Sequence, residues 1–358
     1  MEDNNGTRPV AEQHVFDTQA LLAYLQGRMP GLEGPITVEQ FKGGQSNPTY
    51  KLVTPTASYV MRAKPGPAAK LLKSAHAIER EFRVMNALNG TGVPVPRMHV
   101  LCEDESVIGR AFYVMEFIEG RVFWEQSLPS IDKAGRTALY DEMNRVIATL
   151  HNVDVAAVGL ADYGRPGNYF ERQISRWTKQ YSASITEPIE SMDRLMEWLP
   201  KNLPASARDE REVSVVHGDF RLDNLMFDPT EPKALAILDW ELSTVGHPLA
   251  DFSYHCMSWH IPPGQFRGLG GLDLASLGLP SERDYVRLYC ERTGRPDPDA
   301  LMADWNFYLA YNLFRMAGIL QGIAKRVVDG TASSAQAKQA GAGARPLAEL
   351  GWQFAQGR

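Results

Sequence analysis

The sequence has few cysteines and no long apolar run, and both absences limit the classes of protein it can belong to. Cys102, Cys256 and Cys290 lie far apart among 358 residues and form no CxxC pair. This argues against a disulfide framework or a cysteine-ligated zinc site and is typical of a reduced compartment. No apolar stretch approaches the ~20 residues needed to cross a bilayer. The first thirteen residues are polar, unlike a secretion signal. We therefore expect a cytoplasmic protein with no membrane partner.

The chain also lacks an excess of basic residues. Lys and Arg number 37 against 43 Asp and Glu, which gives a net charge of −6. We therefore expect no nucleic-acid partner, because a phosphate-backbone surface needs clustered basic residues. Hydrophobic residues make up 44% of the chain and charged residues 22%, which is ordinary globular usage. The length indicates about two domains, and the oligomeric state is left open.

The first third of the chain is predicted to be β-rich with one long helix. Residues 1–14 are expected to form a flexible tail, and Asp17 to cap the helix that follows. Apolar stretches between turn residues predict strands within residues 36–53, 58–62 and 107–118, the last holding two strands around Gly109. Apolar periodicity then predicts a long helix over residues 74–88.

After residue 118 the pattern becomes mostly helical. Helices are predicted at residues 133–151, 169–181 and 305–328, with one β-rich island at residues 213–239. Residues 329–343, rich in Gly, Ala, Ser and Gln, are expected to be a flexible connection before a short terminal helix. The fold class is therefore α+β with two lobes, covering residues 15–118 and 119–358, joined by a hinge at about residues 116–120.

The segment 215–227, VVHGDFRLDNLMF, is the most informative part of the sequence. It places Asp219 after an apolar run and Asn224 five residues later, and Asp239 follows a further apolar run. Phosphoryl transfer needs a carboxylate that accepts a hydroxyl proton, and oxygen ligands that hold Mg²⁺ against the phosphates. The spacing resembles that of protein kinases, with Asp219 as the base and the other two as ligands. Alternatively, these residue types are common in turns and could be turn chemistry alone.

A glycine pair early in the chain could cover phosphates. The stretch Gly43, Gly44, Gln45, Ser46 and Asn47 lies between two predicted strands. Glycines allow backbone N–H groups to approach phosphates closely, although such a pair also marks an ordinary hairpin turn. The stretch is not a Walker A loop, because no Gly-Lys-Ser/Thr follows it.

Glu81 lies on the apolar face of the predicted long helix, with apolar residues three before it and four and seven after it. A carboxylate there needs a cationic partner, because an unpaired buried charge is costly. Arg62 on the adjoining strand is the first candidate and Lys64 the second, and either could also neutralise phosphates. Alternatively, these cations are solvated strand-end charges and Glu81 reaches solvent at the edge of the stripe.

With these motifs in order, the chain resembles the aminoglycoside phosphotransferase-like family of small-molecule kinases. The similarity runs from about residue 41 to residue 254, and residues 217–225 and 237–241 are its most specific parts. Residues 43–50 and 74–81 are similar to the branch of kinase domains associated with acyl-CoA dehydrogenases, which phosphorylate 4-hydroxyacyl-CoA thioesters. The resemblance implies a protein-kinase-like fold, ATP and Mg²⁺ as cofactors, and a small-molecule hydroxyl as acceptor.

The resemblance also implies roles for individual residues. Asp219 would be the catalytic carboxylate, Asn224 and Asp239 the Mg²⁺ ligands, and Glu81 the helix glutamate. Arg62 would stand where the family often has lysine, which replaces a point charge with a planar fork.

Further roles are implied around the nucleotide and the loop. Backbone groups of Glu116, Phe117 and Ile118 would hold the adenine. Arg221 would help to neutralise the transferred phosphoryl group, or it is only a strand-end charge. Asp251 is implied to be a helix cap.

The acceptor is indicated only weakly. Aromatic and arginine residues that could contact it, or be core, recur on two predicted helices: Tyr169, Arg172, Arg176, Trp177, Tyr308, Tyr311 and Arg315. From Tyr311 to the end of the chain, six Lys and Arg stand against two Asp and Glu, which favours an anionic hydroxyacyl-CoA over a polycationic aminoglycoside. The alternatives are an aminoglycoside antibiotic kinase and a catalytically silent nucleotide-binding pseudokinase.

Overall fold

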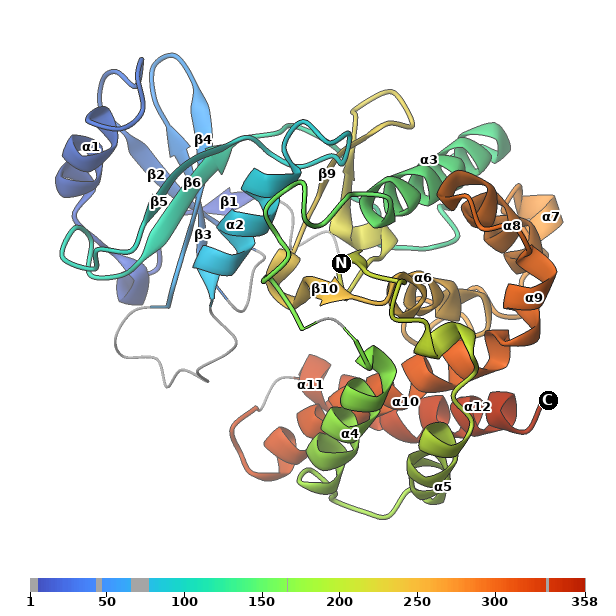
Figure 1. Ribbon diagram of the computed structural model, residues 1–358. Helices are drawn as coiled ribbons and strands as arrows, with labels where there is room; N and C mark the ends of the chain where they lie inside the picture. The colour runs from blue at the N-terminus through green and yellow to red at the C-terminus, as the bar shows by residue number, and fades with distance from the viewer. Residues whose placement is uncertain (1–5, 43–46, 66–76, 166, 333–334, 358) are drawn as a thin grey trace. The chain divides into compact units, whose positions relative to one another are not determined.

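The computed structural model describes residues 6–42, 47–65, 77–165, 167–332 and 335–357. They form two compact units, each described here by itself (Figure 1). Unit 1 comprises Met1–Val122 and Asn224–Ser243, and unit 2 comprises Phe123–Asp223 and Thr244–Arg358. The segment that carries Asn224 and Asp239 therefore belongs with the N-terminal unit, although about a hundred residues of unit 2 precede it in the sequence.

Unit 1 is built on a six-stranded antiparallel sheet with the strand order β1-β2-β3-β4-β6-β5. The strands are β1 (Thr7–Arg8), β2 (Thr37–Phe41), β3 (Thr49–Val53), β4 (Ser58–Ala63), β5 (Met98–Cys102) and β6 (Phe112–Glu116). Two helices accompany it, α1 (Thr18–Gln26) and α2 (Ile78–Leu88). Asp17 caps α1 as predicted, its Oδ1 accepting from Gln19 N at 2.8 Å and Ala20 N at 3.0 Å.

The two helices lie on opposite faces of the sheet, and β4 shows why. Met61 belongs to a buried core with Leu21 and Leu25 of α1. Its neighbour Arg62 points the other way, to Glu81 of α2, because successive strand residues face opposite sides. Figure 1 shows α1 and α2 on either side of the strands. One face of the sheet is therefore apolar core, and the other presents a charge.

Three details of unit 1 differ from the sequence-based prediction. Thr7 and Arg8 of the expected tail pair with β2 as an edge strand, because backbone groups along that edge need partners. The strand expected around Val107 is a turn, and the strand that pairs with β6 on the side away from β4 is Met98–Cys102. The sequence analysis did not predict the strand Met98–Cys102, because it follows directly on a proline-rich run. The beginning of the predicted helix over residues 74–88 lies outside the described residues.

The returning segment of unit 1 is a short hairpin. It contains β8 (Leu225–Phe227), β9 (Ala234–Ile237) and the 3₁₀ turn η6 (Trp240–Leu242). Phe227 and Arg121 exchange backbone hydrogen bonds of 2.7 and 2.8 Å, and Ile237 N donates to Pro94 O at 2.9 Å. These bonds attach the hairpin to the rest of the unit.

Unit 2 is mostly helical, with one two-stranded pair. Its strands are β7 (Ser214–Val216) and β10 (Thr244–Gly246). Its helices are α3 (Lys133–His151), α4 (Tyr169–Ser182), α5 (Glu190–Trp198), α6 (Pro248–Cys256), α7 (Leu274–Leu277), α8 (Glu282–Thr293), α9 (Pro298–Ala303), α10 (Trp305–Val328), α11 (Ala335–Ala342) and α12 (Ala344–Ala355). The remaining 3₁₀ turns are η2 (Glu12–His14) in unit 1, η3 (Leu199–Lys201), η4 (Ser206–Arg208), η7 (Met257–Trp259), and η5 (Leu222–Asn224) at the unit boundary.

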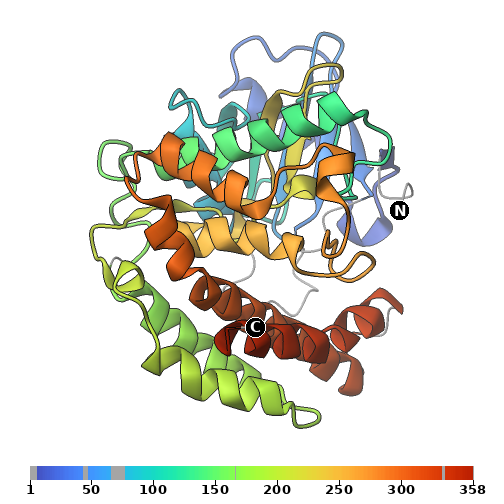
Figure 2. The same cartoon turned by 90° about the vertical axis from the view of Figure 1, so that its right-hand side faces the viewer.

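The long helix α10 is the centre of unit 2, where it packs against α4, α6 and α12 (Figure 2). Tyr308 and Tyr311 of α10 are fully buried, and Phe170 of α4 meets the Tyr311 ring at 4.9 Å between centroids. Both tyrosines are therefore core. The predicted limits of α3 and α10 are confirmed, whereas the expected flexible connection contains the helix α11. Within the described ranges, no helix is long and apolar enough to cross a membrane.

Candidate active site

The central feature of unit 1 is a buried ion pair between β4 and α2. Arg62 Nε lies 3.0 Å from Glu81 Oε2, and the Glu81 side chain is only 3% exposed. Glu81 also accepts from the Tyr113 hydroxyl at 3.0 Å and from Asn47 Nδ2 at 3.2 Å. The predicted pairing of Glu81 with Arg62 is confirmed. The alternative cation, Lys64, pairs with Glu79 at 3.2 Å instead.

The Arg62 guanidinium lies within ion-pair distance of three carboxylates. Its Nη2 is 3.4 Å from Asp239 Oδ1 and 3.7 Å from Glu241 Oε2, in addition to the bond to Glu81. Burial alone would lower the pKa of Arg62, but the surrounding acids, Glu81 first, raise it overall. Burial raises the pKa of the Glu81 carboxyl, and Arg62 limits that rise. The cluster therefore carries more negative than positive charge around one permanently charged guanidinium.

Asp239 and Asn224 come together at the open end of the β8–β9 hairpin. Leu238 N donates to Asn224 O at 2.7 Å, which puts Asp239 one residue beyond the partner of Asn224. Asp239 adopts a left-handed conformation with φ 65° and ψ 62°, which is uncommon for a residue with a Cβ. Its side chain remains 40% exposed. Strain of this kind is typical of functional positions.

The donor atoms fit a magnesium ion. A carboxylate and an amide supply hard oxygen ligands, and Mg²⁺ usually takes only one or two protein carboxylates and completes its shell with phosphates and water. The negative balance around Arg62 also favours a cation. Among the described residues, no group of three or more His, Cys, Asp or Glu is arranged to hold a metal by itself. Any ion here would therefore depend on phosphate oxygens.

Unit 2 contains the loop with Asp219. The Asp219 side chain is 18% exposed, and its Oδ2 lies 3.0 Å from Arg221 Nη2. The Tyr254 hydroxyl of α6 donates to its other oxygen, Oδ1. Burial raises the pKa of Tyr254, so that it remains a donor at physiological pH. The predicted neighbours Asp219 and Arg221 are thus together, and Tyr254 is a partner that sequence reasoning missed.

The backbone of this loop is fixed by Asp251. Its carboxylate accepts from His217 N at 2.7 Å and from Gly218 N at 2.8 Å, and His151 Nε2 lies 3.3 Å away. Asp251 is fully buried, yet its pKa is lowered, because His151 and the loop N–H groups outweigh the cost of burial. Its implied role as a helix cap is wrong, since His247 caps α6 by accepting from Leu249 N at 3.2 Å. Asp251 instead positions the loop.

Arg315 holds the same loop from the other side. Its Nη2 donates to Gly218 O at 2.6 Å, so both peptide groups around Gly218 are engaged. Gly218 has φ 83°, a conformation that favours glycine. The loop therefore presents Asp219 on a rigid backbone.

Asp223 and Arg267 extend the charge cluster of unit 2. Arg267 Nη1 bonds to Asp223 Oδ2, and Arg221 Nη2 is 3.5 Å from the same oxygen. Arg267 has φ 58°, so its backbone is strained as well. No spacing in the sequence links Arg267 to a loop 44 residues away. Only the folded chain reveals it.

Of the predicted phosphate-covering residues 43–47, the structure describes only the last. Gly43, Gly44, Gln45 and Ser46 lie outside the described residues, whereas Asn47 is fully buried.

The predicted hinge segment follows β6. Glu116 N donates to Arg97 O at 2.8 Å, and Lys51 Nζ stands 4.2 Å from the centre of the Phe117 ring. Phe117 and Ile118 are half-buried and follow the last sheet residue directly.

Residues 37–288 of the sequence match the Phosphotransferase enzyme family, which covers most of the chain. The chain belongs to this family. It is a phosphotransferase, and its fold is that of small-molecule kinases.

Two proteins are similar to this phosphotransferase along nearly its whole length. A Ralstonia eutropha protein, described as a candidate aminoglycoside phosphotransferase, is 64% identical, with a TM-score of 0.89 over 96% of this chain and 99% of its own. Acyl-CoA dehydrogenase family member 10 of Mus musculus is 46% identical over 98% of this chain. The match spans only 32% of that longer protein.

A distant structure supports the fold alone. Aminoglycoside phosphotransferase APH(4)-Ia in a ternary complex with AMP-PNP and hygromycin B has a TM-score of 0.60 and 13% identity. It covers 95% of this chain and 99% of its own. The predicted α+β, kinase-like fold of this phosphotransferase is confirmed.

Proposed function

We propose that this phosphotransferase moves the γ-phosphate of Mg·ATP to the hydroxyl of an anionic small molecule of the hydroxyacyl-CoA class. The observation that carries the proposal is the state of Asp219. Its carboxylate is reachable from solvent, while the backbone before it is held by buried Asp251 and Arg315. A fixed, accessible carboxylate with a tyrosine donor is suited to orient a hydroxyl and to take its proton.

The reaction would proceed by in-line displacement. Asp219 accepts the proton of the acceptor hydroxyl as the oxygen forms a bond to the γ-phosphorus, and the bond from that phosphorus to the bridging oxygen breaks to release ADP. The proton leaves Asp219 for solvent after the phosphoester departs. Arg221 lies beside the carboxylate and would balance charge on the transferred group.

The residues of unit 1 take the nucleotide roles in this proposal. Asn224 and Asp239 would hold Mg²⁺, which neutralises charge on the phosphates when bound. Arg62, paired with Glu81 and beside Asp239, would contribute its positive charge to the phosphate site. Residues 43–47 would cover the phosphates, and Glu116, Phe117 and Ile118 would hold the adenine. The AMP-PNP in the distant aminoglycoside enzyme supports ATP as donor.

The acceptor class is supported by the 46% identity to a protein named as an acyl-CoA dehydrogenase family member. An aminoglycoside acceptor is the second candidate, favoured by the description of the 64% identical Ralstonia protein. A polycationic acceptor and an anionic one need cavities of opposite charge, so the two are separable by experiment.

The test is an ADP-release assay with Mg·ATP and a panel of acceptors: 4-hydroxyacyl-CoA thioesters, kanamycin, hygromycin B, choline and homoserine. We expect turnover with the CoA thioesters and a loss of about 10²–10⁴ in kcat for Asp219→Asn, the range for an acid–base group. AMP-PNP should bind both forms equally. Turnover only with an aminoglycoside would show that the acceptor is an aminoglycoside and not a hydroxyacyl-CoA. Nucleotide binding without any turnover would identify a pseudokinase.

A further inference from the structure

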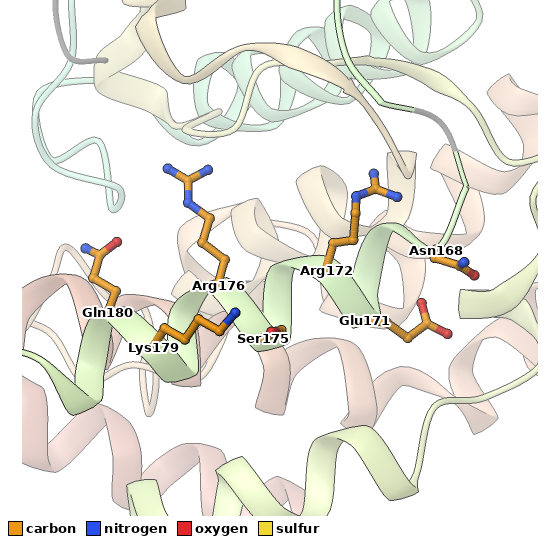
Figure 3. Close-up of a pocket in the computed structure, with 7 residues that line it drawn as sticks. All are labelled: Asn168, Glu171, Arg172, Ser175, Arg176, Lys179 and Gln180. Atoms are coloured by element: carbon orange, nitrogen blue, oxygen red, sulfur yellow. The ribbon is translucent and has the colours of Figure 1, made fainter. Parts of the chain in front are cut away.

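An open pocket of about 950 Å³ lies along α4, and its lining includes Arg172 and Arg176, two of the acceptor contacts considered from the sequence. Figure 3 shows Arg172 and Arg176 extending from α4 in the same direction into the open space. The lining residues are Asn168, Glu171, Arg172, Ser175, Arg176, Lys179 and Gln180. We refer to this surface as the α4 groove.

The α4 groove is basic in a chain that is acidic as a whole. Three cations and one carboxylate line it, whereas the entire chain has a net charge of −6. Arg176 and Lys179 are exposed, and no ion pair joins either of them to a carboxylate in the described part of the chain. Arg172 differs, because it donates to Arg165 O. Two exposed cations one helical turn apart are thus available to an anionic ligand.

Packed side chains connect the α4 groove to the Asp219 loop within unit 2. Trp177, next to Arg176, is buried, and the Arg315 guanidinium lies 5.6 Å from its ring centre. Arg315 donates to Gly218 O and lies 5.0 Å from the ring centre of Tyr254, which bonds to Asp219. One residue therefore contacts both the helix that forms the groove and the catalytic loop.

We propose that the α4 groove binds the phosphate groups of the acceptor, the 3′-phosphate and diphosphate of a CoA thioester, through Arg176 and Lys179. This inference rests on the proposed function. Guanidinium and ammonium groups recognise phosphate by charge-assisted hydrogen bonds, and a guanidinium can bind two oxygens at once. A polycationic aminoglycoside would be repelled by the same groups. The groove therefore selects the charge of the acceptor.

The test measures binding of free coenzyme A by calorimetry in the presence of Mg·AMP-PNP, so that no turnover is needed. Wild type is compared with R176E/K179E, the milder R176Q/K179Q, and the control R283E/R287E. Arg283 and Arg287 are exposed arginines of α8 with exposed acidic partners, and reversing them costs little. We expect coenzyme A to bind at least about 10-fold more weakly to R176E/K179E, and the control to match wild type.

Two further measurements make the result specific. Removing the 3′-phosphate, with dephospho-coenzyme A as the probe, should weaken binding to wild type by several fold and change binding to R176Q/K179Q less. AMP-PNP affinity and the thermal midpoint should not differ between wild type and R176Q/K179Q. Coenzyme A affinity that is absent in wild type, or unchanged in both groove variants, overturns the proposal. If AMP-PNP itself fails to bind wild type, the proposed function fails separately.

Discussion

The charge clusters of the two units have opposite balances. In unit 1, Glu81, Asp239 and Glu241 surround a single guanidinium, that of Arg62. In unit 2, Asp219 and Asp223 stand among the three guanidinium groups of Arg221, Arg267 and Arg315. The first cluster has a net negative charge and suits a metal cation. In the second, three guanidinium groups outnumber Asp219 and Asp223, while the buried Asp251 is bound by loop N–H groups and His151, so this cluster suits a phosphoryl anion. Each unit thus carries the charge that one partner in phosphoryl transfer requires.

The clusters also differ in burial. Glu81 is almost fully enclosed, with an ion pair to Arg62 and hydrogen bonds from Tyr113 and Asn47, while the side chains of Asp219 and Asp239 are 18% and 40% exposed. A buried and saturated carboxylate has a positioning role, because it has no free face for a ligand. The carboxylates of Asp219 and Asp239 are partly exposed to solvent. Substitutions should therefore affect stability at Glu81 and chemistry at the other two.

The largest stability effect is expected for Glu81→Leu. The change leaves Arg62 buried without its best partner and removes the acceptor of Tyr113 and Asn47. We expect the free energy of unfolding to fall by about 3 kcal/mol, measured by urea denaturation. Glu79→Gln is the matched control, since its pair with Lys64 is half-exposed and should cost less than about 0.5 kcal/mol. Equal losses for both would contradict the distinction drawn between the pairs.

The next effect concerns Asp239. Asp239→Gly removes the carboxylate from a left-handed position, φ 65°, that glycine tolerates without strain. The increase in ATP affinity that Mg²⁺ causes should then be at least about 10-fold smaller than in wild type. The metal-free nucleotide affinity and the unfolding midpoint should stay close to wild type. Fluorescence titration of a labelled ATP analogue with and without Mg²⁺ measures this.

Glu241→Gln serves as the control for Asp239. Glu241 also faces Arg62, with its Oε2 3.7 Å from Arg62 Nη2. Its substitution should leave the Mg²⁺ effect within about threefold of wild type. If the Mg²⁺ effect on ATP affinity fell more in Glu241→Gln than in Asp239→Gly, Glu241 rather than Asp239 would be the metal ligand.

A third effect is the dependence of stability on pH, which is largest for two histidines of unit 2. Burial lowers the pKa of His247 to about 4 and that of His255 to about 3, and both histidines belong to unit 2. In the unfolded chain the two imidazoles have a pKa near 6.5. Below that pH they are therefore protonated in the unfolded state but still neutral in the folded state. Stability is therefore complete above pH 6.5 and falls as the pH drops toward 4. Each histidine should lower the free energy of unfolding by about 1–2 kcal/mol between pH 7.5 and pH 5.

Urea denaturation at the two pH values measures this dependence. His255→Gln should flatten the slope by about one proton, even if the substitution itself destabilises the fold by removing the contact to Tyr285. An unchanged slope in that variant would exclude His255 as the source.

Local pattern was sufficient for much of this structure. The apolar stripe of α2 predicted that Glu81 faces the sheet, with Arg62 as its first candidate partner and Lys64 as its second. Alternation along the strand places both cations on the same face, so only the structure, in which Lys64 pairs with Glu79, decided between them. The limits of α10 could also be predicted, since apolar residues recur with helical spacing through its 24 residues. These features depend on neighbours along the chain or across one strand pair.

The contacts that fix the Asp219 loop could not be predicted in this way. Tyr254 and Arg315 reach the loop from positions 35 and 97 residues away, and nothing in the sequence around them distinguishes them from other aromatic and basic residues of helices. Asp251 resembled a helix cap because it lies in the first turn of α6, a place where acids are usual. Long-range geometry assigned it instead to the loop backbone.

The smallest expected effect tests one of those unpredicted contacts. Tyr254→Phe removes the hydroxyl that donates to Asp219 but keeps the buried ring beside Arg315. Asp219 retains Arg221 at 3.0 Å, so the carboxylate loses only part of its orientation. We expect kcat to fall about 3–10-fold with KM and the thermal midpoint nearly unchanged, which a purely structural role would not produce. Tyr285→Phe, which removes a buried hydroxyl bonded to His255 rather than to the loop, should leave kcat as in wild type. If the two variants lose kcat equally, Tyr254 acts through packing, and the rigid presentation of Asp219 depends on its backbone contacts alone.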